Sequence, residues 1–119
     1  MATCLILAGG FGTRVKEVLG DTPKPLATVN GKPFLFWIAQ SLHHYGFDRL
    51  IFLAHFEARK IIEFAHNLDF PDIKIEVIVE EQPLGTAGSV VNALEKLPDI
   101  ENDLFIINLI LLSTPLVWV

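Results

Sequence analysis

Short apolar runs that are typical of buried β-strands alternate with segments of helical periodicity along this chain. Apolar runs predict strands at Thr3–Leu7 and Arg49–Ala54 and the beginning of another at Leu104–Asn108. Charged and apolar residues that alternate before a further apolar run predict a strand at Lys74–Val79. Because strands and helices alternate, the order favours an α/β fold with a mostly parallel sheet that helices cover on both faces. Right-handed crossovers would bring the carboxyl ends of the strands to one edge of that sheet.

Amphipathic segments fill the gaps between the predicted strands. Helices are expected between Pro33 and Gly46, over Ala58–His66 and over Thr86–Leu97, since proline suits a first turn and glycine a helix end. Cys4 lies alone inside the first apolar run and is expected to be a small core residue rather than a reactive thiol. The apolar positions expected to lie on the buried helix faces are Phe34, Trp37, Ile38, Leu42, Ile61, Ile62, Ala65, Val90, Ala93, Leu94 and Leu97.

A glycine-rich segment, Leu7-Ala8-Gly9-Gly10-Phe11-Gly12-Thr13-Arg14, overlaps the end of the first predicted strand. Its unshielded backbone N–H groups, the Thr13 hydroxyl and the Arg14 guanidinium suit a phosphate, and Lys24 adds a movable positive charge. The segment lacks the Gly-Lys-Ser/Thr ending of a Walker A loop, and Val15 stands where a dinucleotide fingerprint needs glycine. It predicts a nucleoside triphosphate site, with a plain strand-to-helix turn as the alternative.

The chain resembles the sugar-phosphate nucleotidyltransferase family at several motifs in the family's order. Beside the glycine-rich segment they are Pro23-Lys24-Pro25-Leu26, Asn30-Gly31-Lys32-Pro33 and Glu81-Gln82-Pro83-Leu84-Gly85-Thr86-Ala87-Gly88. The resemblance runs from about Thr3 to Asn108. It is strongest to D-glycero-α-D-manno-heptose 1-phosphate guanylyltransferases, although mannose- and glucose-1-phosphate enzymes share these loops.

This resemblance implies a Rossmann-like, GT-A-like three-layer α/β/α fold with a mostly parallel sheet. Residues 1–119 would be the nucleotide-binding part of a C-terminally truncated domain, family-like over 1–108 and divergent over the apolar tail 109–119. The implied reaction transfers a nucleotidyl group from a nucleoside triphosphate, with GTP favoured, to a sugar 1-phosphate and releases pyrophosphate.

Residue roles also follow from the resemblance. Arg14 and Lys24 are the implied catalytic residues: Arg14 stabilises the leaving pyrophosphate, and Lys24 offsets charge near the α-phosphate. Gln82 would bind the edge of the base, with Gly85 allowing close approach. A solvated Lys24 and a Gln82 that only caps a turn are the open alternatives. The implied nucleotide-binding residues are Leu7, Ala8, Gly9, Gly10, Gly12, Thr13, Arg14, Gln82, Pro83, Gly85, Thr86 and Ala87.

The family pattern ends at Asn108. Family members continue into Asn-Gly-Asp, whose aspartate binds Mg²⁺, whereas Ile110 stands at the aspartate position here. Isoleucine cannot coordinate a hard cation, so the ligand for the family's Mg²⁺ is missing, as is the acceptor-sugar half, and turnover by this chain is expected to be impaired. The apolar residues 109–119 indicate a frameshift, a truncation or a replacement strand, and an exposed apolar tail would favour homo-oligomers or aggregation.

Composition narrows the remaining function classes. A net charge of −5 argues against nucleic-acid binding, and Leu104–Val119 is too short and too interrupted for an ordinary membrane span. No secretory signal is evident at the start, so the cytoplasm is the expected location. Glu80 and Glu81 are expected to be surface carboxylates, and no pair of histidines has metal-ligand spacing with a carboxylate or cysteine.

Two alternatives to the enzyme stay open at this point. A nucleotide-binding or regulatory module without catalysis would keep both loops and lack the metal site, and a poorly folded fragment would have neither function. The base and the sugar are not fixed by side chains, because the second loop would contact the base mainly through its backbone. The heptose resemblance would imply synthesis of lipopolysaccharide, capsule or S-layer glycan precursors.

Overall fold

A computed structural model describes residues 2–8, 26–55, 57–82, 84–97 and 104–108. The phosphate-binding segment from Gly9 to Arg14, together with Lys24, Pro83 and Ile110, lies outside the described residues. The prediction of a divergent tail at 109–119 also falls outside them.

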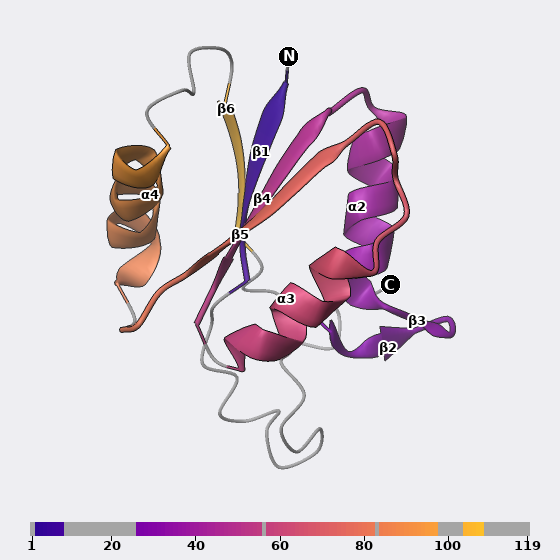
Figure 1. The fold of residues 1–119 in the computed structure, drawn as a ribbon, viewed down its shortest axis with the longest axis horizontal. Helices are drawn as coiled ribbons and strands as arrows, with labels where there is room; N and C mark the ends of the chain where they lie inside the picture. The colour runs from indigo at the N-terminus through magenta and orange to yellow at the C-terminus, as the bar shows by residue number, and fades with distance from the viewer. Residues whose placement is uncertain (1, 9–25, 56, 83, 98–103, 109–119) are drawn as a thin grey trace.

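A parallel sheet runs through the middle of the molecule (Figure 1). Its strands lie in the order β5-β4-β1-β6. Strands β1 (Thr3–Leu7), β4 (Arg49–Ala54) and β5 (Lys74–Val79) have the bounds predicted from the sequence, and β6 (Leu104–Asn108) begins at the predicted residue. Every residue of β1 and β4 is buried, and apart from Arg49 at the start of β4 both strands consist of apolar or small residues.

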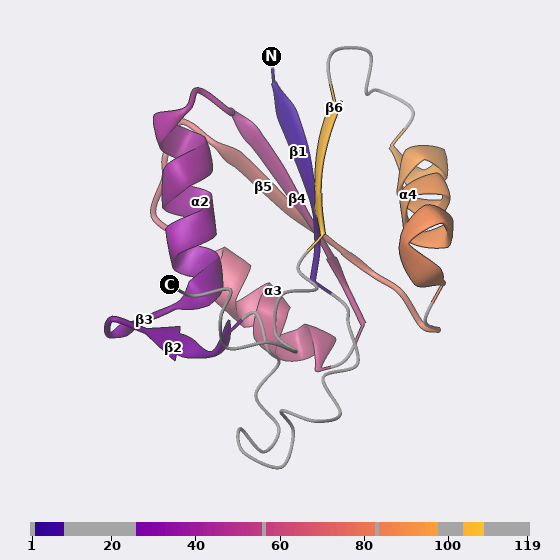
Figure 2. The same cartoon turned by 180° about the vertical axis from the view of Figure 1, so that it is seen from behind.

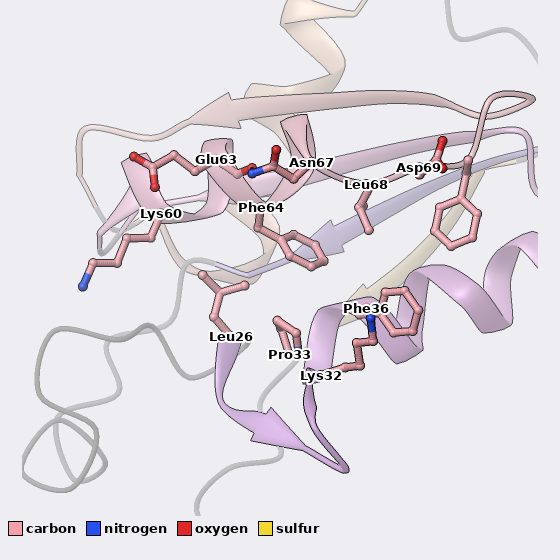
Figure 3. A pocket seen from close by; sticks show the side chains of 11 residues that line it. Leu26, Lys32, Pro33, Phe36, Lys60, Glu63, Phe64, Asn67, Leu68 and Asp69 are labelled. Carbon is pink, nitrogen blue, oxygen red and sulfur yellow. The ribbon is translucent and has the colours of Figure 1, made fainter.

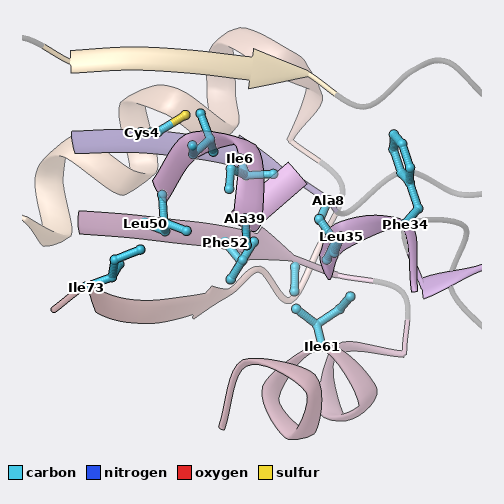
Figure 4. Close-up of a cluster of buried hydrophobic side chains, with 12 residues drawn as sticks. Cys4, Ile6, Ala8, Phe34, Leu35, Ala39, Leu50, Phe52, Ile61 and Ile73 are labelled. Carbon is cyan, nitrogen blue, oxygen red and sulfur yellow. The ribbon is translucent and has the colours of Figure 1, made fainter. Parts of the chain in front are cut away.

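Helices cover both faces of the sheet, so the predicted three-layer α/β/α arrangement is confirmed (Figures 1 and 2). Helices α2 (Phe34–His44) and α3 (Ala58–His66) lie on one face, and α4 (Gly85–Lys96) lies on the other. The face under α2 and α3 buries a cluster that includes Ile6, Phe52 and Ile61 (Figure 4). The opposite cluster joins Leu5 and Ile51 of the sheet to Ala93 of α4.

A short hairpin precedes α2 and was not predicted. Strand β2 (Thr28–Val29) pairs antiparallel with β3 (Lys32–Pro33). At its tip Asn30 has φ 48° and Gly31 has φ 80°, the positive φ values that a type I′ turn requires and that Asn-Gly tolerates. The Trp37 indole N–H donates to the Val29 carbonyl at 2.7 Å, which ties the hairpin to α2.

Two of the predicted buried helix positions are wrong. Ile62 of α3 is 44% exposed and Leu94 of α4 is 41% exposed, whereas Ile61 and Ala93 are fully buried. Neighbouring residues on a helix point about 100° apart, and in these two adjacent pairs Ile61 and Ala93 are the residues that face the sheet. Helix α4 also begins at Gly85, one residue before the predicted start at Thr86.

Cys4 is fully buried in β1, and this burial raises the pKa of its thiol to about 11. We expect the folded protein to resist thiol-modifying reagents at pH 7 and to react once it is unfolded in urea, because the thiolate is the nucleophile. Stability should also fall as the pH rises from about 9 to about 11, where the unfolded thiol loses its proton first. If Cys4 were modified as fast at urea concentrations too low to unfold the protein as it is in the unfolded chain, the prediction would be contradicted.

Candidate functional site

The carboxyl ends of the strands lie level with one another at one edge of the sheet. Leu7 at the end of β1 is in register with Leu53 of β4 and with Asn108 of β6, and Leu53 is in register with Ile78 of β5. Ligands of open α/β sheets bind outside this edge. The chain segments that leave β1 and β5 here are the two that carry the predicted nucleotide-binding motifs.

Leu7 and Ala8 form the described beginning of the first motif. Leu7 is 8% exposed and Ala8 is 2% exposed, so neither side chain presents a surface to a ligand. The Ala8 amide donates to the Leu53 carbonyl at 2.9 Å, which extends the sheet hydrogen bonding by one residue. The chain is thereby held firmly up to the point where the glycines begin. Any contact from these two residues would come from the backbone.

The second motif forms the turn from β5 into α4. Gln82, Gly85, Thr86 and Ala87 are exposed there, as a ligand-contacting surface requires. Gly85 has φ 71°, a left-handed conformation, and a Cβ at this position would meet nothing within 4 Å. The glycine is therefore explained by its backbone angle, while the close approach of a base that we expected at this position stays a prediction.

Helix α4 begins at this turn without a side-chain cap. Its N-cap residue, Leu84, makes no side-chain hydrogen bond, and the first turn contains no acidic residue. The amino end of a helix carries a partial positive charge, which favours an anion or an electronegative group nearby. The turn therefore adds a mild positive potential at the carboxyl edge of the sheet.

Glu80 is buried, so its predicted surface location is wrong. The residue is 6% exposed, and the Oε2 oxygen is buried without a hydrogen-bond partner. Its amide donates to the Ala54 carbonyl at 2.7 Å, so the sheet ladder continues one residue past the end of β5. Since side chains alternate along a strand, Glu80 shares the α4 face with Ile78, whereas Glu81 is exposed as expected.

His55 follows β4 and was assigned no role from the sequence. Its Nδ1 atom lies 2.7 Å from the Glu80 carbonyl oxygen, which can only accept, so Nδ1 carries the proton and donates. This contact joins the ends of β4 and β5. The parallel register places residue 55 beside residue 80, which is the signal in the sequence that could have found the pair.

A separate groove of about 680 Å³ lies on the α2 and α3 face (Figure 3). It is largely apolar and includes Phe36, Phe64 and Phe70, with Lys32 and Lys60 contributing positive charge. None of the described nucleotide-site candidates, Leu7, Ala8, Gln82 and residues 85–87, lines this groove. Its remaining lining residues are Leu26, Pro33, Glu63, Asn67, Leu68 and Asp69.

The sequence resemblance implies a Mg²⁺-binding aspartate at position 110, where this chain has isoleucine. The hydrocarbon side chain of Ile110 has no oxygen to offer to a hard cation. Within 2–8, 26–55, 57–82, 84–97 and 104–108, no three His, Cys, Asp or Glu side chains come together in a way that could hold a metal ion. In the same ranges, no helix has the length and apolar character needed to cross a bilayer.

Comparison with known proteins identifies the family. Residues 4–109 match the model of the MobA-like NTP transferase domain. The D-glycero-α-D-manno-heptose 1-phosphate guanylyltransferase of Campylobacter jejuni is 36% identical over 104 residues, and that of Aneurinibacillus thermoaerophilus is 35% identical over 104 residues. These matches cover 87% of this chain and 45% and 44% of the respective relatives, so the chain spans less than half of their length.

Solved structures agree with the sequence match. HddC from Yersinia pseudotuberculosis superposes with a TM-score of 0.75 at 41% identity, covering 91% of this chain and 47% of HddC. Its complex with GMP-PN gives a TM-score of 0.76 at 39% identity and the same coverage. These matches confirm the resemblance to the sugar-phosphate nucleotidyltransferases. The chain therefore belongs to the family of MobA-like NTP transferase domains.

Proposed function

We propose that this chain is the nucleotide-binding part of a sugar-1-phosphate nucleotidyltransferase, with residues 1–108 forming the family-like part and 109–119 a divergent apolar tail. The observation that carries the proposal is the all-parallel register of the described sheet. Because of this register, the segments that follow β1 and β5 begin at one edge of the sheet, and they contain the glycine-rich motif and the Glu81–Gly88 motif. Because the chain spans less than half of its relatives, binding is proposed for the chain and transfer for the whole protein.

In the proposed reaction, an oxygen of the sugar 1-phosphate attacks the α-phosphorus of the triphosphate and pyrophosphate leaves. Both reactants are anions, so charge neutralisation and positioning would supply most of the catalysis. The backbone at Gly9, Gly10 and Gly12 would hold the phosphates. Arg14 would stabilise the departing pyrophosphate, and Lys24 would lie between the two reactants.

GTP and a heptose 1-phosphate are the proposed substrates. The support comes from relatives: two are named as D-glycero-α-D-manno-heptose 1-phosphate guanylyltransferases, and HddC has been solved with GMP-PN. Magnesium is proposed as the ion that accompanies the triphosphate. A cytoplasmic location, and a product used for lipopolysaccharide or capsule, complete the proposal.

A second candidate function is a nucleotide-binding module without catalysis, and the observation that favours it is Ile110. A module would bind the triphosphate with equal affinity in the presence and absence of Mg²⁺ and would release no pyrophosphate. Calorimetry in both conditions separates the two functions by the metal dependence of binding, and a pyrophosphate assay with sugar 1-phosphate added detects any transfer. Pyrophosphate release by the chain would exclude the module.

Replacement of Arg14 by alanine tests the phosphate site. We expect the affinity for GTP to fall by about 10- to 100-fold, the loss typical of a hydrogen bond to a charged group, while the affinity for GMP changes little. Arg59→Ala is the matched control, because Arg59 is exposed on α3. Titration calorimetry of both variants measures the difference. Wild-type protein that binds no nucleoside triphosphate would refute the proposed function.

A further inference from the structure

Strand β6 forms one edge of the described sheet (Figure 2). In the strand order β5-β4-β1-β6 it pairs with β1 on one side, and no other described strand lies on its second side. The backbone N–H and C=O groups on the outer side of an edge strand are a template for pairing with another chain. Proteins usually prevent such pairing by placing charged residues on the edge.

The two edges of the described sheet differ in charge. On β5, the opposite edge, Lys74 and Glu76 supply charged groups, and Glu76 is held in an ion pair with Arg49. On β6 the sequence is Leu-Phe-Ile-Ile-Asn, and no charged side chain occurs from residue 104 to residue 119. The edge at β6 is therefore the one that lacks protection against another strand.

Both faces of β6 expose an apolar side chain. Phe105 lies on the α2 face, where its ring contacts that of Phe47, and Ile106 alternates with it onto the α4 face. The exposed fractions of Phe105 and Ile106 are 51% and 46%. Strands that are apolar on both faces are typical of the interior of a parallel sheet, where each strand has two neighbours.

Helix α4, which covers the face that Ile106 shares, has a stripe of apolar side chains turned to solvent. The stripe consists of exposed residues spaced three and four apart: Leu84, Ala87, Val91 and Leu94. Residues at this spacing lie along one side of a helix. Leu104 of β6 packs against the buried cluster that includes Ala93 of α4, so the strand and the helix are neighbours. Grouped exposed apolar side chains of this kind are typical of a protein interaction site.

We propose that β6 pairs antiparallel with β6 of a second copy of this chain, about a two-fold axis perpendicular to the sheet. The same residues meet from both sides in such a contact, and an uncharged edge is complementary to itself. All five residues of β6 find partners only when Ile106 lies opposite Ile106 of the partner subunit.

This arrangement joins the four described strands of each copy into one sheet of eight. The two α4 helices lie on the same face of that sheet, one on each side of the junction, where their apolar stripes can pack against the partner subunit. The charged β5 edges, with Lys74 and Glu76, end up at the two outer rims. Association therefore stops at a dimer instead of continuing into a filament.

Analytical ultracentrifugation of the full chain over a range of concentrations tests the dimer. We expect the wild type to sediment as a dimer and Ile106→Lys to weaken the association by about tenfold or more, because two like charges would lie directly opposite each other. Ile62→Lys is the matched control, since Ile62 of α3 is 44% exposed and lies on the other sheet face. The control should dimerise as the wild type does.

A charge swap tests the register at the two-fold axis. Ile106→Lys and Ile106→Glu should each be monomeric alone, and an equimolar mixture of the two should dimerise, since opposite charges then face each other. Thermal unfolding of each variant verifies that the monomers are folded. A mixture of folded variants that stays monomeric would overturn the proposed pairing.

Hydrogen exchange of the amides in β6 distinguishes the other occupants of this edge. A monomeric wild type with slow exchange over 104–108 would mean that another segment of the same chain covers β6, and a monomer with fast exchange would mean that the edge stays open. Either result overturns the inference, as do larger species or a dimer that Ile106→Lys leaves intact. The inference is independent of nucleotide binding, so loss of the proposed function would leave it unchanged.

Discussion

Phe52→Ala lowers the free energy of unfolding by about 3–5 kcal/mol, the usual cost of truncating a buried aromatic residue. Phe52 lies in the middle of β4 and is fully buried. The centroid of its ring lies 6.1 Å from the ring centroid of Phe64 on α3, and the two rings make an interplanar angle of 70°. The cavity left by alanine would open at the junction of the sheet with α3, where relaxation is limited by the strands on either side.

Urea denaturation followed by circular dichroism measures this loss. Phe105→Ala is the matched control, because Phe105 lies on β6 and is 51% exposed. Its ring still contacts the ring of Phe47, with the two ring centroids 5.1 Å apart. We expect the control to cost well under half as much. Equal losses for the two variants would mean that β4 is not the centre of the core.

Strands β1 and β4 could be predicted because their burial leaves a clear apolar run in the sequence. Every residue of both strands is buried, and Cys4–Leu7 and Leu50–Ala54 are uninterrupted apolar runs. The helix α3 was predicted with the correct ends for a related reason, since its apolar positions recur at helical spacing. Short-range pattern was sufficient for these elements.

The hairpin and the buried faces required information that short-range pattern did not supply. Asn30-Gly31 is a strong hairpin signal, but each flanking strand has only two residues, too few for an alternation to be visible. Adjacent apolar residues such as Ile61 and Ile62 cannot be ranked until the helix is placed on the sheet. Residues 30–33 were interpreted from the sequence as a family motif, and no turn was predicted there.

The residues assigned to the candidate site from the sequence stay predictions, and two structural features beside the site depend on register. The motif residues from Gln82 to Ala87 were predicted from the sequence and are exposed where described, while the roles of Gly9 to Arg14 and of Lys24 stay predictions. His55 and Glu80 are 25 residues apart, and only the parallel pairing of β4 with β5 brings them together. The burial of Glu80 arises because the sheet hydrogen bonding runs past the apolar run.

Loss of the charge at Arg49 is expected to have an effect as large as that of Phe52→Ala. Arg49 is 5% exposed at the start of β4 and forms a paired contact with Glu76 of β5. Its Nε donates to one carboxylate oxygen at 2.7 Å and its Nη2 donates to the other at 3.2 Å. Arg49→Met removes both bonds and leaves the half-buried Glu76 carboxylate with Lys74, whose Nζ lies 3.5 Å away.

Breaking a buried pair by removing one partner usually costs about 3–5 kcal/mol, whereas replacing both partners by apolar residues costs far less. We therefore expect Arg49→Met to destabilise strongly and Arg49→Met with Glu76→Leu to recover a large part of the loss. The exposed pair of His43 and Asp72, at 3.0 Å, is the control, and His43→Ala should change stability little. Urea denaturation of the four variants, with Glu76→Leu included, completes the double-mutant cycle. A double variant as unstable as Arg49→Met would show that the cost comes from lost packing of the arginine stem rather than from the unpaired Glu76 charge.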